Sequence, residues 1–278
     1  MRSKKLLVPV DFSKVSKNTV AFALDLAKLW NAKILFVHGF RVAFATYERP
    51  SMSPTVEPIS TSGPSEEELS REKLSNFLGT FPHLDAVAHS DIVGLGPAVN
   101  IIEQTADNEN VDLVVMGTTG ASEVEGFFIG TNSEKVSRKS PCPVLVIPVD
   151  FKKHTIKTVC LALDDPNNND VPLKILIDLL SAFNAKLRIV HISTNDETAF
   201  SKEKVLQRYQ EPLSRIEHSF HVFYNENPQE GLKEFLDKYP IDLMALMYRQ
   251  HSFLERLFQP GTRKKMVFKT EIPLLVLK

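Results

Sequence analysis

The strongest constraint on the fold is that the sequence repeats its own pattern once. Asn184-Ala185-Lys186 lies 153 residues after Asn31-Ala32-Lys33, and each triplet leads through an apolar run to a histidine, His191 or His38. Later matches keep an offset of 130 residues, so the second copy is shorter in its middle by 23 residues, the difference between the offsets. Self-similarity of this kind indicates two related units that share one chain.

Within the first copy, short apolar runs alternate with amphipathic helical patterns. Residues 111–116 are almost entirely apolar and predict a buried strand, whereas apolar residues in 16–30 recur on one helical face. Such alternation requires a parallel sheet with helices on both faces. We therefore predict an α/β fold with two tandem open five-stranded parallel sheets, in domains at 1–150 and 151–278. Residues 50–64 are rich in Pro, Ser and Thr, and we predict an exposed loop there.

Composition makes several classes of partner and compartment unfavourable. The net charge of -1 gives no basic footprint for nucleic acid or an anionic membrane. No apolar window reaches the roughly 18 residues of a membrane span, and the first residues lack the apolar region of a signal peptide. Cys142 and Cys160 each lie in an apolar run, as buried thiols do in a reducing compartment. We predict a cytoplasmic protein with no nucleic-acid or membrane partner.

Three glycines at fixed spacing form the strongest functional motif. Gly117 and Gly120 follow the apolar run, and nine residues later Gly130-Thr131 opens a helical pattern. Glycines allow backbone N–H groups to approach an anion, and the first turn of a helix offers unpaired donors. The stretch therefore predicts a phosphate cradle, and the alternative is a plain connection that binds nothing.

These residues resemble the universal stress protein family in its tandem, two-domain form. The family's ATP-binding signature is Gly, two residues, Gly, nine residues, Gly and Ser or Thr, which this chain matches without a gap. Pro9-Val10-Asp11-Phe12-Ser13, His38 and the run 141–146 agree with the family pattern as well. The resemblance implies an adenine-nucleotide alpha-hydrolase-like fold with strand order 3-2-1-4-5. It also implies dimer contacts through the last strands, which two copies in one chain could satisfy internally, with a homodimer as a further assembly.

The resemblance also implies the ligand, ATP, accompanied by Mg or Mn, and the residues that contact it. Backbone and hydroxyl groups near Gly130 would hold phosphate, Asp11 the ribose or a divalent ion, and Gly39 the adenine edge. For Asp11, capping the following helix is an equal alternative, with Ser13 the better placed cap. We expect His38 and His191 to be structural, and no protein metal site or catalytic residue. The predicted nucleotide-binding residues are Pro9, Val10, Asp11, Gly39, Met116, Gly117, Thr119, Gly120, Gly130, Thr131, Asn132 and Ser133.

The second copy loses the signature, because Met247, Gln250 and Pro260 replace its three glycines. Their side chains would crowd a phosphate, and proline removes a donor. We therefore expect a non-enzymatic, nucleotide-responsive stress-response protein whose first domain binds ATP and whose second domain is structural or regulatory. The alternatives are a weak metal-dependent ATPase or phosphotransferase that uses Asp11, and a nucleotide-free adaptor that grips a protein through residues 42–65.

Overall fold

The computed structural model describes residues 2–41, 44–47, 55–58, 64–118, 131–152, 155–163, 172–194, 207, 209–247 and 272–278. Its first half runs β1 (Lys5–Pro9), α1 (Lys14–Trp30), β2 (Lys33–Phe40), β3 (Phe44–Tyr47), β4 (Thr55–Pro58), α2 (Glu66–Leu78), a 3-10 helix (Leu84–Ala86), β5 (His89–Leu95), α3 (Ala98–Asn108), β6 (Leu113–Gly117), α4 (Thr131–Lys139) and β7 (Val144–Ile147). The second half runs β8 (Thr158–Leu163), α5 (Lys174–Phe183), β9 (Lys186–Ser193), β10 (His218–Tyr224), α7 (Pro228–Lys238), β11 (Leu243–Met247) and β12 (Leu274–Leu277).

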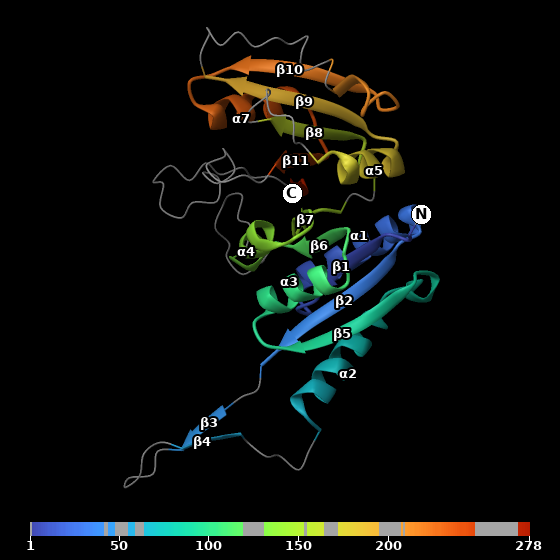
Figure 1. Cartoon of the computed structure of the whole chain (residues 1–278), viewed down its shortest axis with the longest axis vertical. Helices are drawn as coiled ribbons and strands as arrows, with labels where there is room; N and C mark the ends of the chain where they lie inside the picture. The colour runs from blue at the N-terminus through green and yellow to red at the C-terminus, as the bar shows by residue number, and fades with distance from the viewer. Residues whose placement is uncertain are drawn as a thin grey trace.

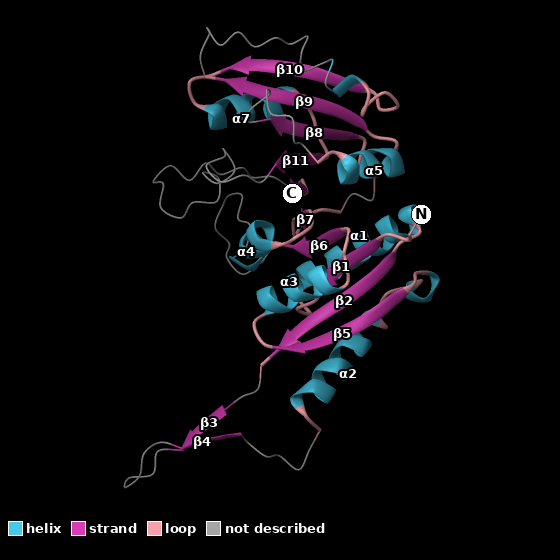
Figure 2. Ribbon diagram, in the orientation of Figure 1, coloured by secondary structure: helices cyan, strands magenta, loops and turns pink. Residues whose placement is uncertain are grey.

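One ten-stranded sheet passes through both halves (Figures 1 and 2), in the order β10-β9-β8-β11-β12-β7-β6-β1-β2-β5. Each half has the strand order 3-2-1-4-5, with parallel pairing between its strands. The two predicted five-stranded sheets are joined edge to edge, because β7 and β12 pair antiparallel. The boundary that we predict after residue 150 lies between β7 and β8.

The strands are buried on both faces because their apolar side chains point alternately to either side. In β1, Leu6 and Val8 enter a core that includes residues of α1, α2 and α5, whereas Leu7 enters the core formed with α3, α4 and α7. Both cores contain residues from both halves, so the helices cover the joined sheet continuously. Cys142 and Cys160 are buried free thiols, in agreement with the sequence.

The repeated Asn-Ala-Lys triplet ends the first helix of each half. Asn31 follows α1 with a φ of 47°, and Asn184 follows α5 with a φ of 50°. Asparagine tolerates this left-handed conformation better than most residues with a side chain, and it lets the chain reverse into the next strand. The most visible sequence repeat therefore encodes a helix end.

The halves also meet where α1 packs beside α5. The indole Nε1 of Trp30 donates to the carbonyl oxygen of Asp178 at 3.2 Å, and the Asp178 carboxylate lies 3.3 Å from the ammonium of Lys4. The rings of Phe22 and Phe183 are stacked with centroids 6.3 Å apart. The helix that follows the first strand of each half thus contributes to the contact between the halves.

One local prediction is wrong. The loop that we predict at 50–64 contains β4, which pairs antiparallel with β3 to form a small separate sheet, drawn apart from the main one (Figure 1). Thr and Val at the start of β4 favour extended backbone more than the prolines around them suggest. Farther along, a 3-10 helix at Leu84–Ala86 precedes β5, which begins at His89.

Candidate functional site

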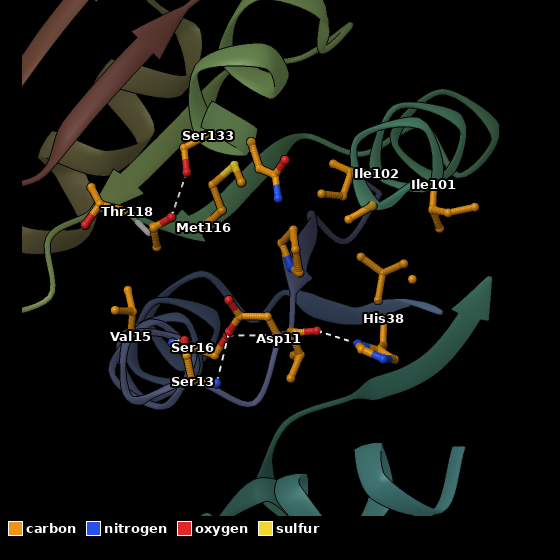
Figure 3. A pocket seen from close by; sticks show the side chains of 17 residues that line it. Asp11, Ser13, Val15, Ser16, His38, Ile101, Ile102, Met116, Thr118 and Ser133 are labelled. Atoms are coloured by element: carbon orange, nitrogen blue, oxygen red, sulfur yellow. Dashed lines mark hydrogen bonds between the residues drawn. The ribbon is translucent and has the colours of Figure 1, made fainter. Parts of the chain in front are cut away.

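A pocket of about 110 Å³ lies at the carboxyl ends of β1, β2 and β6 (Figure 3). Residues at or near the N-terminal ends of α1, α3 and α4 complete its wall. The strand order reverses between β1 and β6, since β2 and β5 lie on one side of β1 and β6 and β7 on the other. Ligands of open α/β sheets bind at such a reversal.

The turn between β1 and α1 is built around the carboxylate of Asp11 (Figure 3). Its Oδ1 accepts from the backbone N–H of Ser13 at 3.0 Å and from the hydroxyl of Ser16 through a short hydrogen bond. Ser13 is the N-cap of α1, and its hydroxyl accepts from the backbone N–H of Ser16 at 3.1 Å. Asp11 therefore supports the cap without being the cap itself.

The charge on Asp11 is favoured by this network. Partial burial raises the pKa of Asp11, but the hydrogen bonds from Ser13 and Ser16 outweigh it, and the net pKa lies below the ordinary value of 3.8. At neutral pH the pocket thus contains one carboxylate with one oxygen already engaged.

His38 lines the pocket and contacts the end of β1. Its Nδ1 lies 2.7 Å from the carbonyl oxygen of Val10, so this nitrogen carries the proton that is donated. His191 makes the corresponding contact with the carbonyl oxygen of Leu163 at 3.0 Å, across the same 28-residue separation. Because the contact exists in both halves, it supports the structural role that we expect. The ring of Phe12 packs on the ring of His38, with the two ring centroids 4.5 Å apart. The backbone of Phe12 has a φ of 63°.

Gly117 ends β6 where α1 passes very close. A Cβ built on Gly117 would lie 2.3 Å from Cγ1 of Val15 and 2.9 Å from Oγ1 of Thr19. The hydroxyl of Ser133, in the first turn of α4, donates to the carbonyl oxygen of Gly117 at 2.8 Å. Gly117 thus has a packing function in addition to the predicted phosphate contact, and the Ser133 proton is directed to the protein.

Apolar side chains line much of the remaining pocket, and sequence reasoning missed them. Val37, Ala98, Ile101 and Ile102 line it, as does Met116, which we predicted. The three on α3 look like ordinary core residues in the sequence, because the periodicity of an amphipathic helix is the same in both cases. This apolar surface offers a planar base the packing partner that Gly39 lacks.

Two glycines bring α3 onto the sheet. Gly39 and Gly94 are paired in register on β2 and β5. A Cβ on Gly39 would lie 3.2 Å from the Cα of Ala98, and one on Gly94 would lie 2.8 Å from Cγ2 of Ile101. The absence of both side chains allows the first turns of α3 to reach the pocket. The paired glycines are the sequence signal that could have identified this wall.

Eight of the twelve predicted residues line this one pocket. They are Pro9, Val10, Asp11, Gly39, Met116, Gly117, Asn132 and Ser133. Thr131 begins α4 and is not part of the lining. Thr119, Gly120 and Gly130 lie outside the described residues.

The corresponding region of the second half is packed differently. Met247, the last residue of β11, occupies the position of Gly117, whereas Asp164, Gln250 and Pro260 lie outside the described residues. Ile192 stands where the first half has Gly39, and Gly231 stands where α3 has Ile101, by the offsets of 153 and 130 residues. A Cβ on Gly231 would lie 2.7 Å from Cγ2 of Ile192. The large and small residues are therefore exchanged between strand and helix.

The described ranges contain no group of three or more His, Cys, Asp or Glu side chains suited to a metal ion. No helix in the part of the chain that the structure describes is long and apolar enough to cross a membrane.

Comparison with known proteins places the first half in a family. The model of the universal stress protein family matches residues 2–148. Universal stress protein MJ0531 of Methanocaldococcus jannaschii is 30% identical over 145 residues, which cover 52% of this chain and 81% of that protein. A universal stress protein of Thermus aquaticus is 32% identical over 147 residues, covering 52% of this chain and 98% of its own length.

Both halves together match a solved structure in fold. A universal stress protein from Archaeoglobus fulgidus superposes with a TM-score of 0.68 at 18% identity, covering 100% of this chain and 97% of the other. At this level of identity the similarity shows that the two chains share a fold. From the match over residues 2–148 and the relatives above, the chain belongs to the universal stress protein family.

Proposed function

We propose that the first half binds an adenine nucleotide in the pocket at the ends of β1, β2 and β6, and that the second half is its structural or regulatory partner. The observation that carries the proposal is that eight residues predicted from the family resemblance, from three separate parts of the sequence, line one pocket at the reversal of strand order. Family membership adds a role in stress response.

The two kinds of surface in the pocket suit the two ends of a nucleotide. Ile101, Ile102 and Met116 offer apolar contact to a planar base. The opposite part contains Thr118 and Asn132 and the first turn of α4, which provide neutral donors for a phosphate. ATP is the nucleotide that the family resemblance implies.

A binding role fits these residues better than catalysis. A general base works best when its pKa lies near the operating pH. Partial burial raises the pKa of Asp11, but the hydrogen bonds from Ser13 and Ser16 lower it below its ordinary value, so this carboxylate is a weak proton acceptor at neutral pH. We expect any ATP hydrolysis to be slow and incidental. The output is then a change of conformation or association.

Nucleotide-dependent thermal unfolding of the full chain tests this proposal. A ligand present at about 100 times its Kd stabilises a protein by about 2.7 kcal/mol. We expect ATP or AMP to stabilise the parent protein, and Gly130→Val to abolish this effect because the branched side chain blocks the approach of a phosphate.

Pro260→Val is the matched control, because Pro260 holds the corresponding position in the second half. We expect this variant to respond to nucleotide as the parent does. Equal stabilisation of Gly130→Val and the parent would count against binding in the first half. A loss confined to Pro260→Val would move the site to the second half.

A further inference from the structure

The described residues that line the pocket carry little positive charge. None of the seventeen described residues that line it is a lysine or arginine, and Asp11 brings a negative charge. The sequence that connects Thr118 to Thr131 contains Glu123 and Glu125 and no basic residue. Wherever those side chains lie, they add no cation to the site.

Helix ends supply the positive potential that remains. α1, α3 and α4 direct their N-terminal ends to the pocket, through Ser13, Ala98 and Asn132 respectively. The N-cap of α3, Pro97, makes no side-chain cap hydrogen bond, so this end keeps N–H groups for a ligand. The N-terminal end of a helix acts as roughly half a positive elementary charge. Three such ends and the negative charge of Asp11 together leave a net positive charge of about one half at the pocket.

Basic residues near the pocket in sequence do not line it. Lys14 stands between the lining residues Ser13 and Val15, and Lys135 lies in the second turn of α4, yet both are exposed. Farther along α4, Lys139 lies 3.9 Å from Glu103, so that cation is directed away toward α3. The described residues thus offer one phosphate enough positive potential and three phosphates too little.

We propose that this pocket selects adenine nucleotides of low charge, and binds a nucleoside monophosphate more tightly than a triphosphate unless a divalent cation accompanies the triphosphate. The inference rests on the proposed function and deepens it, because it concerns the class of ligand at the same site. Each phosphate beyond the first would add negative charge beside Asp11, with no cation among the described lining residues to balance it.

Calorimetric titration of the full chain with AMP, ADP and ATP at constant ionic strength tests the inference. In EDTA we expect the affinity for AMP to exceed that for ATP by about tenfold or more, with the affinity for ADP between them. Added Mg²⁺ should bring the ATP affinity toward that of AMP and change AMP binding little.

A charge placed at the phosphate end should shift this preference. Asn132→Lys adds a cation in the first turn of α4, and we expect it to raise ATP affinity in EDTA more than AMP affinity. Asn108→Lys is the matched control, because it adds the same charge at the exposed far end of α3 and should alter neither.

The possible outcomes are distinct. ATP binding as tightly as AMP in EDTA, or an equal effect of both lysine variants, would overturn the charge inference and leave the proposed function standing. Absence of binding by all three nucleotides would remove the proposed function and this inference with it.

Discussion

Replacing Gly117 with alanine tests whether this signature glycine has a packing function apart from any ligand. Its backbone lies outside the left-handed region, so alanine meets no conformational penalty there. The added methyl group would instead lie 2.3 Å from Cγ1 of Val15, well inside van der Waals contact. The side chain of Val15, the end of β6 or the first turn of α1 must move.

The magnitude follows from two opposing effects. Inserting a methyl group into a packed core costs about 1–3 kcal/mol. Loss of glycine's freedom in the unfolded chain returns about 0.4–1 kcal/mol. We expect Gly117→Ala to lower the free energy of unfolding by about 1–2 kcal/mol. In proteins of about 150–250 residues, each kcal/mol lowers Tm by about 2–4 °C.

Urea unfolding of the nucleotide-free protein measures this effect, and a double-mutant cycle assigns its cause. Val15→Ala alone removes two methyl carbons and should cost about 1.5 kcal/mol. In the double variant the 2.3 Å contact no longer exists. We therefore expect the double variant to lose about 1 kcal/mol less stability than the sum of the losses of the two single variants.

Gly79→Ala is the matched control, because a Cβ there meets its nearest atom at 3.4 Å, an ordinary contact, and its backbone is helical. It should leave stability unchanged or raise it slightly. A Gly117→Ala protein as stable as Gly79→Ala, or strictly additive losses in the cycle, would refute the packing function of Gly117.

Three further predictions concern stability. Asp11→Asn should lower the free energy of unfolding at pH 7. Because folding lowers the pKa of Asp11, the difference in stability between parent and variant should persist above pH 3.8 and disappear as the pH falls through the lower pKa of the folded state. Unfolding measured as a function of pH tests this. Asn31→Ala should cost about 1 kcal/mol, because it places an ordinary side chain at a φ of 47°, and Asn31→Gly should not; equal melting temperatures would contradict this. Trp30→Phe removes the donor to the carbonyl oxygen of Asp178 and should cost about 1 kcal/mol in urea unfolding, whereas no change would show that the hydrogen bond contributes nothing.

The strands and helices of each half could be predicted from patterns that a sequence carries openly, whereas their order in the sheet could not. Apolar runs alternate with amphipathic helices, and the resemblance to a family supplied the order 3-2-1-4-5. The continuous sheet is harder to derive, because the pairing of Val144 with Val276 joins strands far apart in the chain and leaves no local signal. The helix end at Asn31 is an intermediate case. The repeated Asn-Ala-Lys triplet is visible in the sequence, but the left-handed backbone conformation of Asn31 is visible only in the structure.

The site shows the same division between local and spatial information. Backbone-dependent positions such as Gly117 and Asp11 stand out as motifs, so the sequence placed them at the pocket. Ile101 and Ile102 could not be separated from core residues, because only the close approach of α3 over Gly39 makes them part of the wall. The hydrogen bond from Ser133 to Gly117 likewise depends on how two elements meet.

The pairing of β7 with β12 inside a single polypeptide sets the stoichiometry of the assembly. Two separate subunits joined through these strands would form like and unlike pairs in proportions governed by their concentrations. Here every translated molecule contains one half with Gly39 and one with Ile192, so the ratio is fixed at synthesis and does not change on dilution. Among the described strands, β5 and β10 stand at opposite ends of the sheet, so an additional subunit that joined the described sheet by strand pairing would attach there.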